Sequence, residues 1–139
     1  MATITYKTDL VGVDWGEMKA TLLQDYFDNG RTPMQLQKSF QSSAHVCLAY
    51  ADGRLIGTAR ALSDGVCNGY IADVWTLSEF RHQGVASTMI QNLLEKMPGQ
   101  HVYLFSDDAA DFYKRIGFVE RPVGLEIVVG RWLDNTPLA

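Results

Sequence analysis

Several common signals are scarce or absent in this sequence of 139 residues. Its two cysteines, Cys47 and Cys67, are too few for a disulfide framework and lack an evident catalytic partner, so we expect both to be structural. No segment approaches the roughly 18 to 20 consecutive apolar residues that a membrane-spanning helix needs. Residues 1–6 lack a basic stretch followed by an apolar one. We therefore expect no signal peptide, and a cytoplasmic location.

The charge balance and the missing nucleotide motifs exclude further classes. The formal net charge is -4, whereas domains that bind nucleic acid usually carry a basic excess. We expect neither nucleic acid nor a membrane among the partners. The sequence has no G-x-x-x-x-G-K-[ST], which excludes a P-loop, and no G-x-G-x-x-G after the first strand, which argues against a Rossmann site. No His, Cys and Asp cluster has metal-ligand spacing, so we expect no metal.

The apolar periodicity predicts one α/β domain over residues 1–139 with a mixed sheet. Asp52-Gly53 predicts a hairpin turn, and the strand-helix-strand order over residues 70–105 predicts a parallel strand pair. The remaining strands pair in an antiparallel manner. The predicted strands are residues 4–7, 45–51, 54–62, 70–77, 101–105 and 125–131, the last paired with residues 118–121. The predicted helices follow Asp14 and Thr32 and cover residues 85–97 and 109–116.

Two helix starts carry side-chain caps. Asp14 caps the first helix, on which Met18, Leu22 and Tyr26 share one face with Trp15. Thr32 caps the second helix, with Pro33 in its first turn and Gln35 completing a capping box.

One turn has the features of an anion site: Arg81-His82-Gln83-Gly84-Val85-Ala86. It lies between a predicted strand and a predicted helix, so it offers unpaired backbone N–H groups and the positive end of a helix dipole. Gly84 has no Cβ, so a ligand can come close to the backbone. These features favour a phosphate or pyrophosphate.

A second element follows about 30 residues later: Phe112-Tyr113-Lys114-Arg115-Ile116-Gly117-Phe118. Because this element follows residues 76–86 in the chain, the sequence resembles the GNAT superfamily of acetyl-CoA-dependent N-acetyltransferases. Residues 76–86 resemble that family's cofactor motif, and residues 106–118 resemble its second motif. The chain departs from the family at Ser78, where proline is frequent, and at Ala86, where glycine is frequent.

The resemblance implies where acetyl-CoA binds. It implies about four helices on both faces of a mostly antiparallel sheet, whose one parallel pair splays apart at the cofactor site. The pantetheine arm would lie in this gap, and the pyrophosphate at the turn. Ser106 either contacts the arm or only caps a helix. The cofactor-binding residues implied are Val74, Trp75, Thr76, Arg81, His82, Gln83, Gly84, Val85, Ala86, Ser87 and Ser106.

The resemblance also implies direct attack of an amine on the thioester. A backbone N–H near Trp75 or Thr76 would polarise the carbonyl. Tyr113 matches the family's usual proton donor to the leaving thiolate, although by its spacing alone it could be a core aromatic. Asp73 is a candidate general base acting through water, because a carboxylate within a sheet needs a partner or a cleft. A structural hydrogen bond or a position at the rim is the alternative, and Glu126 is a rival candidate for the base. Asp25 and Asp28 would favour a cationic amine, unless they lie on a solvated helix face.

The expected function is acetyl transfer from acetyl-CoA to a primary amine in a ternary complex. The acceptor is expected to be a small aryl- or alkylamine or a protein amine, and the aromatic residues Trp75, Tyr26 and Phe27 favour a small aromatic one. A catalytically inactive CoA sensor is the alternative, and a longer acyl-CoA a further one. The resemblance also allows a homodimer.

Overall fold

The computed structural model describes residues 2–138, which divide into two compact units, one ending at Phe105 and the other beginning at Ser106. This division does not test the prediction of a single domain, which stays a prediction. The second unit contains helix α4 (Ala110–Arg115). The elements of the first unit are β1 (Ile4–Lys7), α1 (Trp15–Gln24), α2 (Pro33–Gln41), β2 (His45–Ala51), β3 (Arg54–Ser63), β4 (Asn68–Thr76), the 3-10 turn η1 (Ser78–Phe80), α3 (Val85–Glu95) and β5 (His101–Tyr103).

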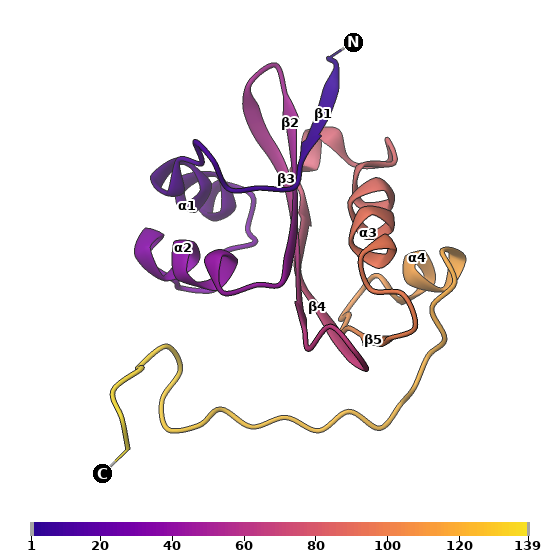
Figure 1. Cartoon of the computed structure of the whole chain (residues 1–139). Helices are drawn as coiled ribbons and strands as arrows, with labels where there is room; N and C mark the ends of the chain where they lie inside the picture. The colour runs from indigo at the N-terminus through magenta and orange to yellow at the C-terminus, as the bar shows by residue number, and fades with distance from the viewer. Residues whose placement is uncertain (1, 139) are drawn as a thin grey trace. The chain divides into compact units, whose positions relative to one another are not determined.

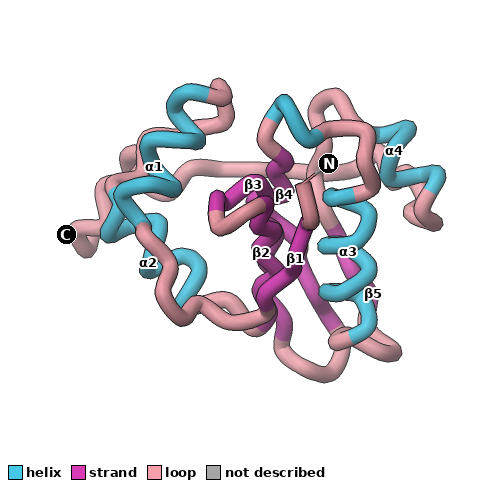
Figure 2. Tube along the Cα trace, turned by 90° about the horizontal axis from the view of Figure 1, so that it is seen from above, coloured by secondary structure: helices cyan, strands magenta, loops and turns pink. Residues whose placement is uncertain are grey.

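The five strands form one sheet in the order β1-β2-β3-β4-β5. The pairs β1–β2, β2–β3 and β3–β4 are antiparallel, and β4–β5 is parallel. Helices α1 and α2 cover one face of this sheet, and α3 covers the other (Figures 1 and 2). The predicted fold class, α/β with a mixed sheet and one parallel pair, is confirmed.

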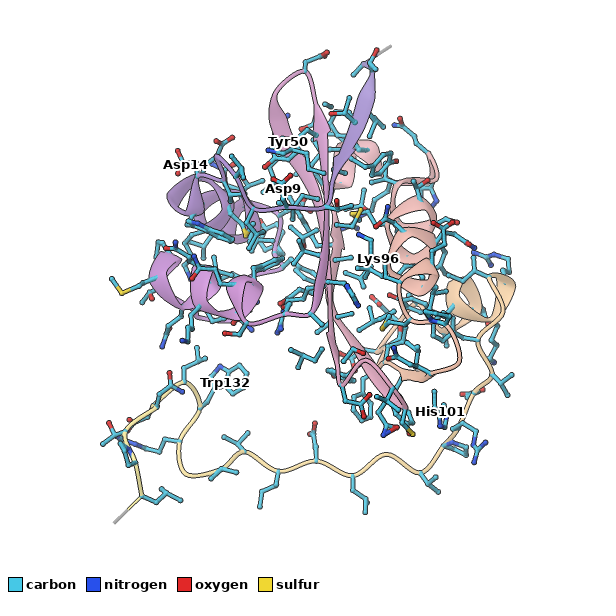
Figure 3. The ribbon with its side chains drawn as sticks, in the orientation of Figure 1. Asp9, Asp14, Tyr50, Lys96, His101 and Trp132 are labelled. Carbon is cyan, nitrogen blue, oxygen red and sulfur yellow. The ribbon has the colours of Figure 1, made fainter. Side chains whose placement is uncertain are left out.

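The starts of the first two helices form as their side chains predict. Asp14 (labelled in Figure 3) accepts a hydrogen bond from the Glu17 backbone N–H at 3.0 Å. Thr32 and Gln35 form the predicted capping box, with their reciprocal bonds at 3.1 and 3.0 Å. Each cap satisfies backbone donors that have no partner inside the helix.

The prediction that Tyr26 shares a helix face with Trp15, Met18 and Leu22 is wrong. The helix ends at Gln24, and Tyr26 follows with φ of 59°, in the left-handed region. Met18 and Leu22 are buried as predicted, but Tyr26 is 97% exposed. Because the backbone is left-handed at Tyr26, the helical spacing no longer applies there, and the side chain does not continue the buried face of α1.

The core of the first unit lies on both faces of the sheet (Figure 3). Cys47, Leu48 and Ala49 follow one another on β2 and are all buried, because helices cover both faces. Cys67 is exposed. The buried helix residues are Met18, Leu22, Leu36 and Phe40 on one face and Val85, Met89, Ile90 and Leu93 on the other.

The strands predicted at residues 118–121 and 125–131 are not present: the described part of the second unit contains no strand. An extended segment becomes a strand only when another segment pairs with its backbone groups, and hydrophobic spacing alone cannot supply that partner. The apolar side chains of this stretch are exposed: Val119, Val123, Leu125, Ile127, Val128 and Val129.

Candidate functional site

Strand β4 is distorted at Asp73. The register between β3 and β4 shifts between Thr58 and Arg60. At this point Asp73 has φ of 53°, in the left-handed region, and its carbonyl accepts a hydrogen bond from Thr58 Oγ1 at 2.7 Å. Such a bulge bends a strand and increases its twist.

Beyond its first residues, one edge of β4 is free of strand partners. Strand β5 pairs with β4 only over Asn68–Tyr70, opposite His101–Tyr103. Along residues 71–76, no other strand among residues 2–138 pairs with this edge. The predicted residues Val74, Trp75 and Thr76 lie in this part. An extended ligand can pair with such an edge as an added strand does.

The turn after β4 presents unpaired donors. The Leu77 N–H donates to Ile56 O at 2.8 Å, and η1 follows. His82 (φ 64°) and Gly84 (φ 79°) are both left-handed. Within residues 2–138, no acceptor binds the backbone N–H groups of residues 82–87. Successive free N–H groups at a helix start make an anion-binding concavity.

The side chains of this turn differ in their accessibility. Gly84 has open space where a Cβ would lie, and its positive φ favours glycine. Val85 is buried in the core, so only its backbone N–H is offered to a ligand. The Arg81 side chain is half exposed, and its Nε donates to Thr76 O at 3.1 Å. His82 is exposed.

The carboxylate of Asp73 is held by two arginines. Arg31 binds it with two nitrogens, at 2.7 and 3.1 Å, and Arg60 Nε lies 2.5 Å away. Burial by itself raises the pKa of Asp73, but the hydrogen bonds and charges of Arg31 and Arg60 outweigh it and hold the pKa below 3.8. A carboxylate held in this way is a weak base. Its role as general base stays a prediction, and its surroundings favour the structural alternative.

Asp25 has partners that the sequence did not predict. Its carboxylate accepts hydrogen bonds from Trp75 Nε1 at 2.9 Å and from Ser78 Oγ at 2.5 Å and Ser78 N at 3.2 Å. Arg81 lies 3.5 Å away. Burial alone raises the pKa of the Asp25 carboxyl. These hydrogen bonds and the charge of Arg81 lower the pKa by more, so it lies below its ordinary value. The side chain is only 10% exposed, so Asp25 lies on no solvated helix face.

Asp28 and the aromatic residues also differ from expectation. Asp28 pairs with Lys19 at 2.7 Å, so its charge is neutralised within the α1–α2 region. Trp75 is 2% exposed, and therefore offers no ring face to an acceptor. Tyr26 and Phe27 are exposed.

The second unit contains Tyr113 and Ser106. Tyr113 is 9% exposed, and its ring contacts Phe112 and Phe118 with centroids 5.0 and 5.6 Å away. Burial raises the pKa of Tyr113, so its hydroxyl is protonated at neutral pH. Ser106 Oγ accepts from the Ala109 N–H at 2.9 Å, in the turn before α4. This bond fits the capping alternative; the cofactor contact of Ser106 stays a prediction.

The sequence could not reveal the two carboxylate networks. Arg31 lies 42 positions from Asp73, and Asp25 lies 50 positions from Trp75. Ser78 was the one sequence signal for the Asp25 network. It stands where the resembled family often has proline, and a serine offers a backbone N–H and a hydroxyl donor that proline lacks.

Comparison with known proteins decides the family. The model of the acetyltransferase (GNAT) family matches residues 15–118. The chain belongs to this family. It is 32% identical over 80 residues to an uncharacterised N-acetyltransferase, ycf52, of Pyropia yezoensis; the match covers 55% of this chain and 46% of that protein. This GNAT chain therefore spans less than half the length of that relative.

Solved structures support the same fold. A probable acetyltransferase of Staphylococcus aureus superposes on this GNAT chain with a TM-score of 0.79 at 19% identity, covering 91% of this chain and all of that one. An acetyltransferase of Clostridium acetobutylicum, whose structure includes acetyl-CoA, gives 0.69 at 19% identity, covering 91% and 96%.

Two further observations concern residues 2–138 only. None of their helices is both long and apolar enough to cross a bilayer. No three His, Cys, Asp or Glu side chains among them are arranged to hold a metal ion.

Proposed function

We propose that this chain transfers the acetyl group of acetyl-CoA to a primary amine by direct attack in a ternary complex. One observation carries the proposal: within residues 2–138, the part of the β4 edge without a strand partner runs directly into a turn whose N–H groups lack acceptors. The edge suits an extended arm with amide groups, and the turn suits a doubly charged phosphate group. Acetyl-CoA carries both an arm with amide groups and a pyrophosphate, and it supplies an activated acetyl thioester.

The residues of the turn would bind the pyrophosphate. The N–H groups from His82 to Ser87 have no acceptor among residues 2–138, and the positive end of the α3 dipole adds to their attraction for an anion. Arg81 and Gln83 add side-chain donors at the rim. Gly84 keeps the approach to the backbone open.

The open part of β4 would orient the thioester. Its backbone groups at Val74, Trp75 and Thr76 would pair with the arm, and one N–H near Trp75 or Thr76 would stabilise the oxyanion that develops during attack. Trp75 is fixed by its hydrogen bond to Asp25, so this segment is held in place before a ligand binds.

Tyr113 would protonate the leaving thiolate. Its family motif supports this role, and burial raises the pKa of its hydroxyl, so the proton is present at neutral pH. The attacking amine must be neutral. With Asp73 engaged by two arginines, water is the simpler first acceptor of the amine's proton.

The acceptor is a primary amine, either a small aryl- or alkylamine or a protein amine. Exposed Tyr26 and Phe27 follow α1 directly, next to the residue that binds Trp75, and they support a small aromatic amine.

The test is to mix the chain with acetyl-CoA and a panel of arylamines, alkylamines and lysine peptides, following thiol release and product mass. We expect acetylation of at least one class. Binding of CoA without turnover on any amine would overturn the proposal and would favour the alternative, a catalytically inactive CoA sensor.

Gly84→Glu tests the binding part of the proposal. The added carboxylate would occupy the approach to the turn and repel the pyrophosphate, so we expect calorimetry to detect no CoA binding. Gly99→Glu is the matched control, because Gly99 has nearly the same φ (75°) and the same open space but lies after α3. It should retain the wild-type affinity; equal losses in both variants would contradict the assignment of the turn.

A further inference from the structure

Asp25 stands at an unfavourable place for a carboxylate. It is the C-cap residue, directly after the last residue of α1, and its own N–H still donates to Thr21 O. The C-terminal end of a helix carries partial negative charge, which repels an anion by about 0.3 to 1 kcal/mol. An aspartate there whose side chain is only 10% exposed needs donors from elsewhere in the fold.

Those donors all come from the connection between β4 and α3. Trp75 is on the unpaired part of β4, Ser78 begins η1, and Arg81 directly precedes the residues with free N–H groups. Arg81 also binds back to Thr76 O, so it joins the start and the end of this connection. One carboxylate thus contacts three successive parts of the segment.

The connection crosses from one layer to the other. Helix α1 lies on one face of the sheet and α3 on the opposite face (Figures 1 and 2). Asp25 therefore ties the α1 layer to the turn that begins α3. The Leu77 N–H donates to Ile56 O of β3, but this hydrogen bond precedes η1 and does not fix the residues after it.

We propose that Asp25 is a positioning residue for the cofactor turn. Its ionised carboxylate holds Trp75, Ser78 and Arg81 so that the N–H groups of residues 82–87 are oriented before the ligand arrives. This inference rests on the proposed function, since it takes CoA as the ligand of that turn. Preorganised donors bind an anion more tightly because no ordering cost is paid on binding.

The chain offers a matched control in Asp28. It is the same residue type, three positions later, with a similarly shielded side chain and a lowered pKa. Its partners are Lys19 and the Gly30 N–H, and neither belongs to the β4–α3 connection. A general effect of removing a shielded carboxylate from this region would appear in both Asn variants.

The experiment compares wild type, Asp25→Asn and Asp28→Asn by CoA calorimetry and by steady-state kinetics with an active amine. For Asp25→Asn we expect the CoA dissociation constant and the KM for acetyl-CoA to rise about tenfold, within the loss of up to about 100-fold that misplaced binding groups cause. We expect kcat at saturating acetyl-CoA to change less than about threefold. Asp28→Asn should leave both constants unchanged.

A purely structural role would give another pattern. Fewer folded molecules would lower kcat and the melting temperature while KM and the dissociation constant stayed at their wild-type values. That result, or an equal rise in KM for Asp28→Asn, overturns the inference. If the wild type binds no CoA, the proposed function is overturned and this inference with it. If the wild type binds CoA and Asp25→Asn binds it with equal affinity, only the inference is overturned.

Ser78→Ala provides a second route if Asp25→Asn fails to fold. It removes one donor to Asp25 and keeps the backbone N–H bond. We expect a rise of about threefold in the CoA dissociation constant of Ser78→Ala alone. Where Asp25→Asn folds, the effects of the two substitutions should be less than additive when combined. An unchanged constant in Ser78→Ala, or full additivity, contradicts the inference.

Discussion

Ile90 and Ile127 are the same amino acid in opposite surroundings. Ile90, on α3 in the first unit, is fully buried, whereas Ile127 in the second unit is 86% exposed. The contrast extends to their neighbours. Apolar side chains pack on both faces of the sheet in the first unit, and those of residues 119–129 in the second unit are largely exposed.

This difference concerns how much each unit contributes to stability. Burial of apolar surface is the main favourable contribution to folding, so the first unit should supply most of the stability. The second unit contributes the family's proposed proton donor, Tyr113, with little apolar burial of its own. Substitutions of buried residues in the first unit should therefore lower the free energy of unfolding, whereas substitution of Tyr113 should lower kcat.

The largest effect on stability is expected for Ile90→Ala. Removal of a fully buried isoleucine side chain costs about 2 to 5 kcal/mol, since the cavity left behind adds to the lost burial. Chemical denaturation should show this loss in the free energy of unfolding.

Ile127→Ala is the matched control for that substitution. An exposed side chain has little burial to lose, so we expect a change within about 0.5 kcal/mol. A loss as large as that of Ile90→Ala would break the comparison, because it would mean that Ile127 is buried in solution by another segment or a second copy.

The next effect is expected for Asp73→Asn, which leaves Arg31 and Arg60 without their counter-charge. Breaking a shielded ion pair by removing one partner costs about 3 kcal/mol. The cost should depend on pH. Because the folded pKa of Asp73 is lowered, its contribution is complete above the ordinary value of 3.8 and is lost as the pH falls through the folded pKa.

The measurement is the unfolding free energy of wild type and Asp73→Asn between pH 7 and pH 2. The gap between the two proteins should be widest at neutral pH and close progressively below about pH 4. A gap that stayed constant over this range would show that the charge of Asp73 does not stabilise the folded protein.

The smallest effect in free energy is expected for Tyr113→Phe, and it should appear in the rate. The substitution keeps the ring contacts with Phe112 and Phe118 and removes only the hydroxyl. We expect kcat to fall by about tenfold to 100-fold, in line with loss of a general acid. The acetyl-CoA affinity and the melting temperature should stay near wild type. Unchanged kcat would remove Tyr113 as the acid.

Much of the fold could be predicted because its signals are local. The capping box of Thr32 and Gln35, the turn at Asp52-Gly53 and the strand-turn-helix around Gly84 depend on residues within a few positions of one another. The predicted strand at residues 125–131 failed for the opposite reason. Its alternation is local, but a strand exists only with a partner, and the sequence of one segment does not name its neighbour.

The sequence by itself determined the order of elements in the first unit, the strand-turn-helix around Gly84 and the family motifs, because each rests on backbone preferences or side-chain types that are close along the chain. Only the tertiary structure decided what the two aspartates do. Asp73 meets Arg31 and Asp25 meets Trp75 only after the helices α1 and α2 pack on the sheet in one register. Ion pairs and hydrogen bonds act over a few ångströms in space, so separation along the chain gives no measure of them.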